Sequence, residues 1–109
     1  MSEETTLIGK GIRIEGEITG KAPIEVWGEI EGTAGTEGEF SVREGGKVKG
    51  EVAARSVIIE GEVEGQVTAE QKIELRATCK VNGQLTTKNL AIADGAFFEG
   101  QVKMTGGGQ

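Results

Sequence analysis

The sequence predicts an all-β protein, a right-handed parallel β-helix of about six triangular turns with about 17 residues in each turn. Three observations predict this fold. A pattern of the form apolar-x-Gly-x-apolar recurs six times, and a second pattern, apolar-x-apolar, recurs between its copies. Glycine makes up 19 of the 109 residues although the chain contains only one proline, which excludes a proline-rich linker or a collagen-like chain.

The first pattern predicts one strand segment in every turn. Its central glycines are separated by 16, 18, 15, 18 and 17 residues, whereas helical repeats run for roughly 33–47 residues. At about 3.3 Å per residue, one repeat supplies roughly 55 Å of chain, enough for three short strands. The six copies are IEGEI (14–18), IEGTA (30–34), VKGEV (48–52), VEGQV (63–67), VNGQL (81–85) and FEGQV (98–102).

The central glycine of each copy has the same parity as the apolar residues predicted to be buried. Glycine weakens a strand interior because it costs backbone entropy and packs no side chain. We therefore expect Gly65 and its five equivalents at corners, where a positive φ or a close backbone approach requires glycine. A meander of β-hairpins is the alternative, although Asn-Gly and Asp-Gly signals are few.

The second pattern predicts another strand in each turn. The distance from its first residue to the next copy of the first pattern is six residues in two turns and eight in three others. A left-handed hexapeptide helix would keep a strict count of six, so the irregularity favours the right-handed coil. The pairs are Ile24/Val26, Phe40/Val42, Val57/Ile59, Ile73/Leu75 and Leu90/Ile92, with Ile8 as a degenerate first copy.

The turns with the longer spacing contain the segments EGGK, ATCK and DGAF, which predict small loops. Cys79 lies in one of them and aligns with Gly46 and Ala96. We expect it to be a small buried residue that fills a tight inner turn.

The composition predicts one domain, a core at 7–104 between a short flexible tail at 1–6 and a flexible glycine-rich tail at 105–109. The acidic segment MSEETT is no signal peptide, and no run of about 18 apolar residues is present. The net charge of −6 argues against nucleic acid as a partner. These features favour a cytoplasmic location.

No catalytic residue, cofactor-binding residue or metal ligand is predicted. The chain has no histidine and one cysteine, so Ser-His and Cys-His pairs and the usual zinc sets are excluded. The many carboxylates fall at outward positions such as Glu15, Glu31 and Glu64. The sequence therefore predicts no enzyme and no cofactor.

The two ends of a β-helix carry unpaired strand edges over exposed core residues, and such edges pair with other chains unless they are capped. Two such ends in one subunit predict an open homopolymer. We expect the C-terminal contact to comprise Phe97, Phe98, Val102 and Met104. We expect the N-terminal contact to comprise Ile8, Ile12 and Ile14.

Stacking of the turns also predicts columns of outward side chains. Trp27 precedes Arg43 and Glu60 in one column, and Ile58 lies among the polar residues of another. These two side chains are candidates for a lateral or partner surface. They leave open an alternative function, a non-polymerising β-helical module that presents this surface to a protein partner. Another column predicts an amide ladder of Gln66, Gln84 and Gln101.

The six glycine-centred copies, the run SVIIEGEVEGQVTAEQKIELRATCKVNGQL and the ending LAIADGAFFEGQVKM resemble the bactofilins over roughly Leu7 to Met104. The resemblance implies a bacterial cytoskeletal protein with a right-handed β-helical core that polymerises through its ends without nucleotide. It further implies a scaffold for cell shape or for positioning cell-wall machinery, at the inner face of the cytoplasmic membrane and with cell-envelope proteins as partners. Some bactofilins carry an apolar N-terminal membrane-targeting segment, which MSEETT does not resemble.

Overall fold

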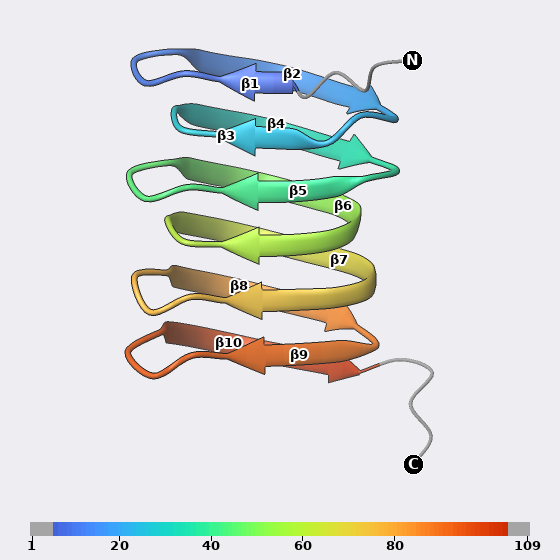
Figure 1. The fold of residues 1–109 in the computed structure, drawn as a ribbon, viewed down its shortest axis with the longest axis vertical. Coiled ribbons are helices and arrows are strands. Elements are labelled where there is room, and N and C mark those ends of the chain that lie inside the picture. The colour runs from blue at the N-terminus through green and yellow to red at the C-terminus, as the bar shows by residue number, and fades with distance from the viewer. Residues whose placement is uncertain (1–5, 105–109) are drawn as a thin grey trace.

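The chain winds into a single right-handed coil of about six turns in the computed structural model, which describes residues 6–104. Strands that run in one direction form the front of the coil in Figure 1, and strands that run in the opposite direction form its back. All ladders between described strands are parallel. The parallel β-helix is confirmed, and the meander of antiparallel hairpins is excluded.

Each turn consists of a strand from the second pattern, a loop, and a strand from the first pattern. The first two turns contain β1 (Thr6–Ile8), β2 (Arg13–Gly20), β3 (Ile24–Val26) and β4 (Glu29–Thr36). Turns three to five contain β5 (Glu39–Val42), β6 (Lys47–Ile59), β7 (Glu62–Leu75) and β8 (Lys80–Thr87). The sixth contains β9 (Asn89–Ile92) and β10 (Phe97–Met104). The predicted tails lie outside the described residues, except that Thr6 is the first residue of β1.

The register between turns follows the sequence repeat. Gly16 pairs with Gly32, and the same column continues through Gly50, Gly65, Gly83 and Gly100. All six have φ values between 123° and 139°. A side chain would be strained at these angles, so the glycines bend each long strand where two faces of the coil meet. The prediction of glycine corners is confirmed.

The core is a column of apolar side chains enclosed by the coil. Residues that stack in register, such as Val48, Val63 and Val81, point inward and are buried. Phe40 is the largest fully buried side chain. Cys79 is also buried, in the column that contains Gly46, Gly61 and Ala96. Its predicted place in a tight inner turn is therefore confirmed.

One corner of the coil carries loops of two lengths. Loops of four residues occur in turns one, three, five and six, at 9–12, 43–46, 76–79 and 93–96, and connections of two residues occur in turns two and four, at 27–28 and 60–61. Each four-residue loop closes with a hydrogen bond, such as that from Gly46 N–H to the Arg43 carbonyl at 2.8 Å. In Figure 1 the loops at the left accordingly project far in some turns and little in others.

Candidate functional site: the two ends of the coil

The last turn exposes residues whose equivalents in earlier turns are buried. Ile92 is 54% exposed, whereas Leu75, its register partner, is fully buried. Val102 is 37% exposed, whereas its partner Leu85 is fully buried. These side chains point inward, and they are exposed because no further turn of the chain covers them. The C-terminal end is therefore an open section through the core.

The predicted C-terminal residues surround this section. Phe98 stacks on buried Val81 and is half-buried, and Met104 stacks beneath buried Thr87 and is exposed. Phe97 continues the outward column of Lys80 and is also exposed. The structure thus brings Phe97, Phe98, Val102 and Met104 onto one end of the coil. Sequence reasoning missed Ile92, although its place in the last apolar pair was the available signal.

The N-terminal end is a smaller apolar section. Ile14 and Ile18 point inward and are half-buried above Ile30 and Ala34, which are fully buried. Ile12 is exposed on the loop beside them. Ile8, predicted as a contact residue, is only 3% exposed and belongs to the core of a single chain. Ile18 was not predicted, although it occupies the final apolar position of the first glycine-centred copy.

Strand edges at both ends are unpaired among residues 6–104. β1 and β2 form ladders only with β3 and β4, and β9 and β10 form ladders only with β7 and β8. Each outer edge presents backbone N–H and C=O groups without a ladder partner in the described chain. Such an edge can accept another strand in parallel or antiparallel orientation.

Trp27 lies on the outer surface in an ionic cluster. Glu25 accepts hydrogen bonds from Arg43 Nε at 2.9 Å and Nη2 at 2.7 Å, and from the indole N–H of Trp27 at 3.3 Å. Glu60 lies 3.6 Å from Arg43 Nη1. The hydrogen bonds from Arg43, and then that from Trp27, lower the pKa of Glu25, and the bond to Glu25 raises the pKa of Arg43.

The two predicted partner-surface residues, Trp27 and Ile58, are less available than expected. Both are half-buried. Ile58 stacks between Ser41, which is buried, and Glu74, which is half-buried, so neighbours in its own column cover much of its side chain.

The predicted amide ladder is confirmed on another outward column. Gln66 donates to Gln84 at 3.3 Å, and Gln84 donates to Gln101 at 3.5 Å. Gln84, in the middle, uses its N–H₂ group toward the next turn and its oxygen toward the previous one. The ladder therefore adds side-chain contacts to the backbone pairing of the last three turns on this face.

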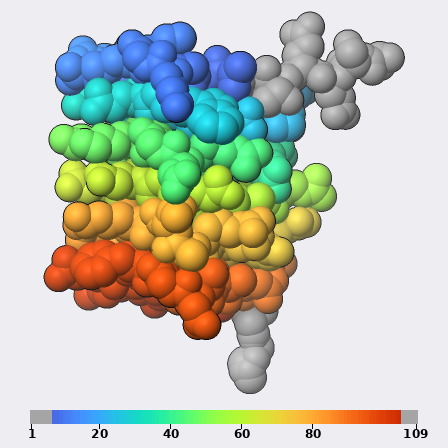
Figure 2. Space-filling model, turned by 60° about the vertical axis from the view of Figure 1, so that its left-hand side comes forward, coloured from blue at the N-terminus to red at the C-terminus, as the bar shows by residue number. Residues whose placement is uncertain are grey.

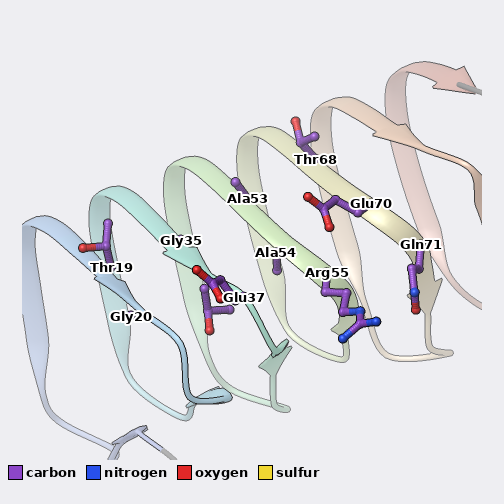
Figure 3. A pocket seen from close by; sticks show the side chains of 11 residues that line it. Thr19, Gly20, Gly35, Glu37, Ala53, Ala54, Arg55, Thr68, Glu70 and Gln71 are labelled. Carbon is purple, nitrogen blue, oxygen red and sulfur yellow. The ribbon is translucent and has the colours of Figure 1, made fainter.

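A shallow groove of about 700 Å³ follows the corner opposite the loops. Figure 3 shows Thr19, Ala53 and Thr68 along this groove, in a column in which Gly35 lies between Thr19 and Ala53, with Arg55 and Glu70 at the border of the groove. Small side chains and mixed charges of this kind supply neither a nucleophile–base pair nor a ligand set. No group of residues that could hold a metal ion occurs among the described residues. No helix long and apolar enough to cross a membrane is found there.

Comparison with known proteins agrees with this geometry. The family model described as "Bactofilin: Polymer-forming cytoskeletal" matches residues 6–103. Bactofilin BacN from Myxococcus xanthus (strain DK1622) is 50% identical over 101 residues, which covers 93% of this chain and 89% of that protein. The crystal structure of a mutant bactofilin from Thermus thermophilus superposes with a TM-score of 0.77 at 34% identity. That match covers 83% of this chain and all of the other.

Proposed function

Because the chain belongs to the bactofilin family of polymer-forming cytoskeletal proteins, we propose that it assembles end to end into filaments without nucleotide. The observation that carries this proposal is the open core section at the C-terminal end, where Ile92 and Val102 are exposed although their equivalents one turn earlier are buried. A second copy that docks on this section covers the apolar side chains of the last turn, just as each turn of the coil covers those of the turn before it.

The energy for docking comes from two sources. Unpaired groups on β9 and β10 can form ladder hydrogen bonds with the incoming chain, each worth about 0.5–1.5 kcal/mol net. The exposed parts of Phe98, Val102, Met104 and Ile92 can be removed from water, at about 25 cal/mol per Å² of apolar surface. Phe98 is the largest of these side chains and lies on the inward parity, so we expect it to act as the anchor.

The proposed cellular role is the one that the resemblance to bactofilins implies. A cytoskeletal polymer of this kind serves as a scaffold for cell shape or for positioning cell-wall machinery, in the cytoplasm and at the inner face of the membrane. Its first partner is a second copy of itself, and cell-envelope proteins are further partners. Neither nucleotide nor metal enters the assembly, which relies on strand pairing and apolar contact at the ends.

The test is Phe98→Arg, which places a charge on the docking section. An unpaired charge buried at that contact costs about 3–5 kcal/mol, and Phe97→Arg tests the rim in the same way. Upstream turns contact only their neighbours, so they should remain folded. The matched control is Thr68→Arg, which adds the same charge to an exposed position in a middle turn.

Each protein is treated with apyrase to remove nucleotide and is then examined by negative-stain microscopy and sedimentation velocity. We expect filaments from the wild type and from Thr68→Arg, and folded monomers or small closed oligomers from Phe98→Arg. Long filaments from a Phe98→Arg protein that circular dichroism shows to be folded would rule out the C-terminal contact. A wild type that remains monomeric would instead favour the non-polymerising module.

A further inference from the structure

The dipeptide Asn82–Gly83 does not form the turn that its sequence usually indicates. Asn-Gly is the strongest short-range signal for a β-hairpin, in which both residues have a positive φ. In this coil Asn82 does not have a positive φ, and it lies inside β8 in parallel ladders with β7 and β10. Gly83 has φ +134° and forms the corner of turn five. The corner therefore accounts for the glycine but not for the asparagine before it.

The residue before the corner glycine is charged in every other copy of the repeat. Asn82 lies in register between Glu64 and Glu99, so it separates two carboxylates with a neutral side chain. Like charges directly opposite each other would destabilise the sheet. The equivalents of Asn82 in the other turns are Glu15, Glu31, Lys49, Glu64 and Glu99.

An asparagine followed by glycine can react with its own backbone, because glycine has no side chain to hinder the attack. The amide nitrogen of Gly83 attacks the side-chain carbonyl carbon of Asn82 and loses its proton to water, and the side-chain nitrogen leaves as ammonia. The product is a five-membered succinimide ring. Water then opens the ring at one of its two carbonyls and gives either aspartate or isoaspartate. The reaction consumes water and needs no oxidant, reductant or enzyme.

The folded coil holds the reacting atoms apart. Residues of a parallel strand have ψ near about +115°, which directs the next backbone nitrogen away from the side chain. Closing the ring requires rotation about the Cα–C bond of Asn82, and this rotation would turn the Gly83 amide out of its ladder. β8 is paired on both edges at this point, with Glu64 of β7 and Glu99 of β10. The reaction therefore requires that these ladders open first.

Turn six is the turn next to Asn82 and can unwind from the end of the coil. The turns form successive layers in Figure 2, and the last turn, in orange and red, is the bottom layer. Among the described strands, β10 pairs only with β8, and its inward residue Val102 is 37% exposed. Local opening begins where few buried contacts hold a segment, and each turn of a repeat contacts only its neighbours. Unwinding of turn six frees one edge of β8, and unwinding of turn five frees the other.

We propose that Asn82 is a site of spontaneous deamidation that reacts when the last two turns unwind, and that its isoaspartate product prevents them from closing again. Isoaspartate inserts one methylene group into the main chain directly before the corner. Gly83 then no longer aligns with Gly65, and the fully buried side chains of Leu85 and Thr87 are displaced from their columns. Because β10 is supported by β8, the C-terminal end of the coil is lost with it.

End-to-end assembly would protect this site. The last turn of a subunit inside a filament is covered by the next copy, so it unwinds less often than the last turn of a free subunit. Free subunits would therefore lose their C-terminal end by deamidation, whereas assembled subunits would keep it. This protection rests on the proposed end contact, but the chemistry at Asn82 does not.

The first experiment measures the reaction at both asparagines of the chain. Asn89 is the internal control, since it is followed by Leu90 and its side chain donates a hydrogen bond to the Gln71 carbonyl at 3.1 Å. The Phe98→Arg protein unfolded in guanidinium chloride, the same protein folded, and wild-type filaments are incubated in mildly alkaline buffer. Peptide mapping by mass spectrometry gives the rate of deamidation at each asparagine.

We expect Asn82 to react faster than Asn89 in the unfolded chain. Its rate should fall more than about tenfold in the folded monomer, and further in filaments. Equal rates at Asn82 in folded and unfolded protein would overturn the proposal, as would an unfolded chain in which Asn82 reacts no faster than Asn89. Filaments that react as fast as folded monomers would refute the protection by assembly.

The second experiment locates the opening with two corner glycines. Gly100 has φ +139° and a Cβ there would overlap the Gly83 carbonyl oxygen, and Gly32 has φ +127° and a Cβ there would overlap the Gly16 carbonyl oxygen. Alanine at either position, in the Phe98→Arg protein, strains one end of the coil. We expect Gly100→Ala to speed deamidation of folded protein more than about tenfold and Gly32→Ala to change it less than about twofold. Equal acceleration by both would show that Asn82 reacts only through global unfolding.

The third experiment tests the effect of the product. Wild type and Asn82→Gln are incubated together in guanidinium chloride and refolded, and isoaspartate is quantified with an isoaspartyl methyltransferase. Glutamine keeps a neutral amide but would have to form a six-membered ring, which closes much more slowly, and changes at other sites are the same in both proteins. We expect the wild type to lose filaments in proportion to its isoaspartate content and Asn82→Gln to keep them. Wild type that is rich in isoaspartate at position 82 and still assembles fully would contradict the proposal.

The outcome is separable from that of the end contact. If the wild type forms no filaments, the end contact fails, and the same incubation is repeated with Asn82→Gln in the Phe98→Arg protein. Thermal unfolding of the refolded monomers then gives the result. The protein that retains Asn82 should have the lower Tm after incubation, and equal Tm values would rule out the proposed effect of isoaspartate.

Discussion

Substitution of Gly65 by alanine would test why the coil places glycine at its corners. Gly65 has φ +123°, and a Cβ built there would overlap the carbonyl oxygen of Gly50 and approach its carbonyl carbon to 2.9 Å. A residue with a side chain is strained at this φ by about 1–3 kcal/mol. The overlap must also displace the ladder between β6 and β7, and each weakened hydrogen bond costs about 0.5–1.5 kcal/mol.

Substitutions at two other glycines separate the cost of backbone strain from the cost of the steric overlap. Gly16 has φ +124°, but it lies in the first turn and a Cβ there meets nothing within 4 Å. Gly20 has neither a positive φ nor a neighbour within that distance. We expect Gly20→Ala to be neutral or slightly stabilising, Gly16→Ala to cost about 1–2 kcal/mol of strain, and Gly65→Ala to cost about 3 kcal/mol or more.

Thermal unfolding followed by circular dichroism provides the measurement. Each glycine substitution is made in the Phe98→Arg protein, so that end-to-end assembly does not contribute to the apparent stability. At about 4–8 °C per kcal/mol for a domain near this size, Gly65→Ala should lower the Tm by about 12–24 °C. Equal Tm values for the Gly16 and Gly65 variants would refute the steric term. A Tm for both that matches Gly20→Ala would refute the corner assignment altogether.

Three further outcomes follow from single contacts. Burial raises the pKa of Cys79, so a thiol reagent should modify the native protein more than about tenfold slower than the unfolded chain, and equal rates would show exposure. Because Arg43 lowers the pKa of Glu25, stability from this pair is present above the unfolded pKa and is lost as the pH falls through the folded pKa. Glu25→Gln should therefore flatten the acid limb of a Tm-against-pH curve, and an unchanged limb would contradict this. Thr87 is fully buried and donates to the Asn89 carbonyl at 3.0 Å, so Thr87→Val should cost about 1 kcal/mol in denaturant unfolding, and no change in the midpoint would show that the bond contributes nothing.

The regular part of this fold could be predicted from the sequence because glycine marks the positions where the backbone has a positive φ. The spacing of Gly16, Gly50 and the other corner glycines defined the turns, and the register followed from it. The Gln66 and Gln84 contact could then be predicted, since both side chains occupy one column. The burial of Cys79 followed from its alignment with Gly46.

Features that depend on the particular neighbours of one side chain, and not on the repeat, could not be predicted from the sequence. The partner of Arg43 is chiefly Glu25, which lies diagonally, two residues before Trp27 in the chain and one turn away from Arg43. Ile58 was predicted to be exposed because it points outward among polar residues of its column, whereas the side chains above and below cover much of it. Ile92 was missed because it belongs to a pair that is buried in every turn but the last.

The direction of the ladders has a mechanical consequence. Strands lie across the long axis of the coil, so their hydrogen bonds run along it. Tension along a filament built by end contacts would therefore load one layer of hydrogen bonds after another, in series. Rupture would occur at the weakest layer, and the junction between subunits is the one layer where no covalent chain crosses. Such a filament would break cleanly between folded subunits and leave two ends that can rejoin.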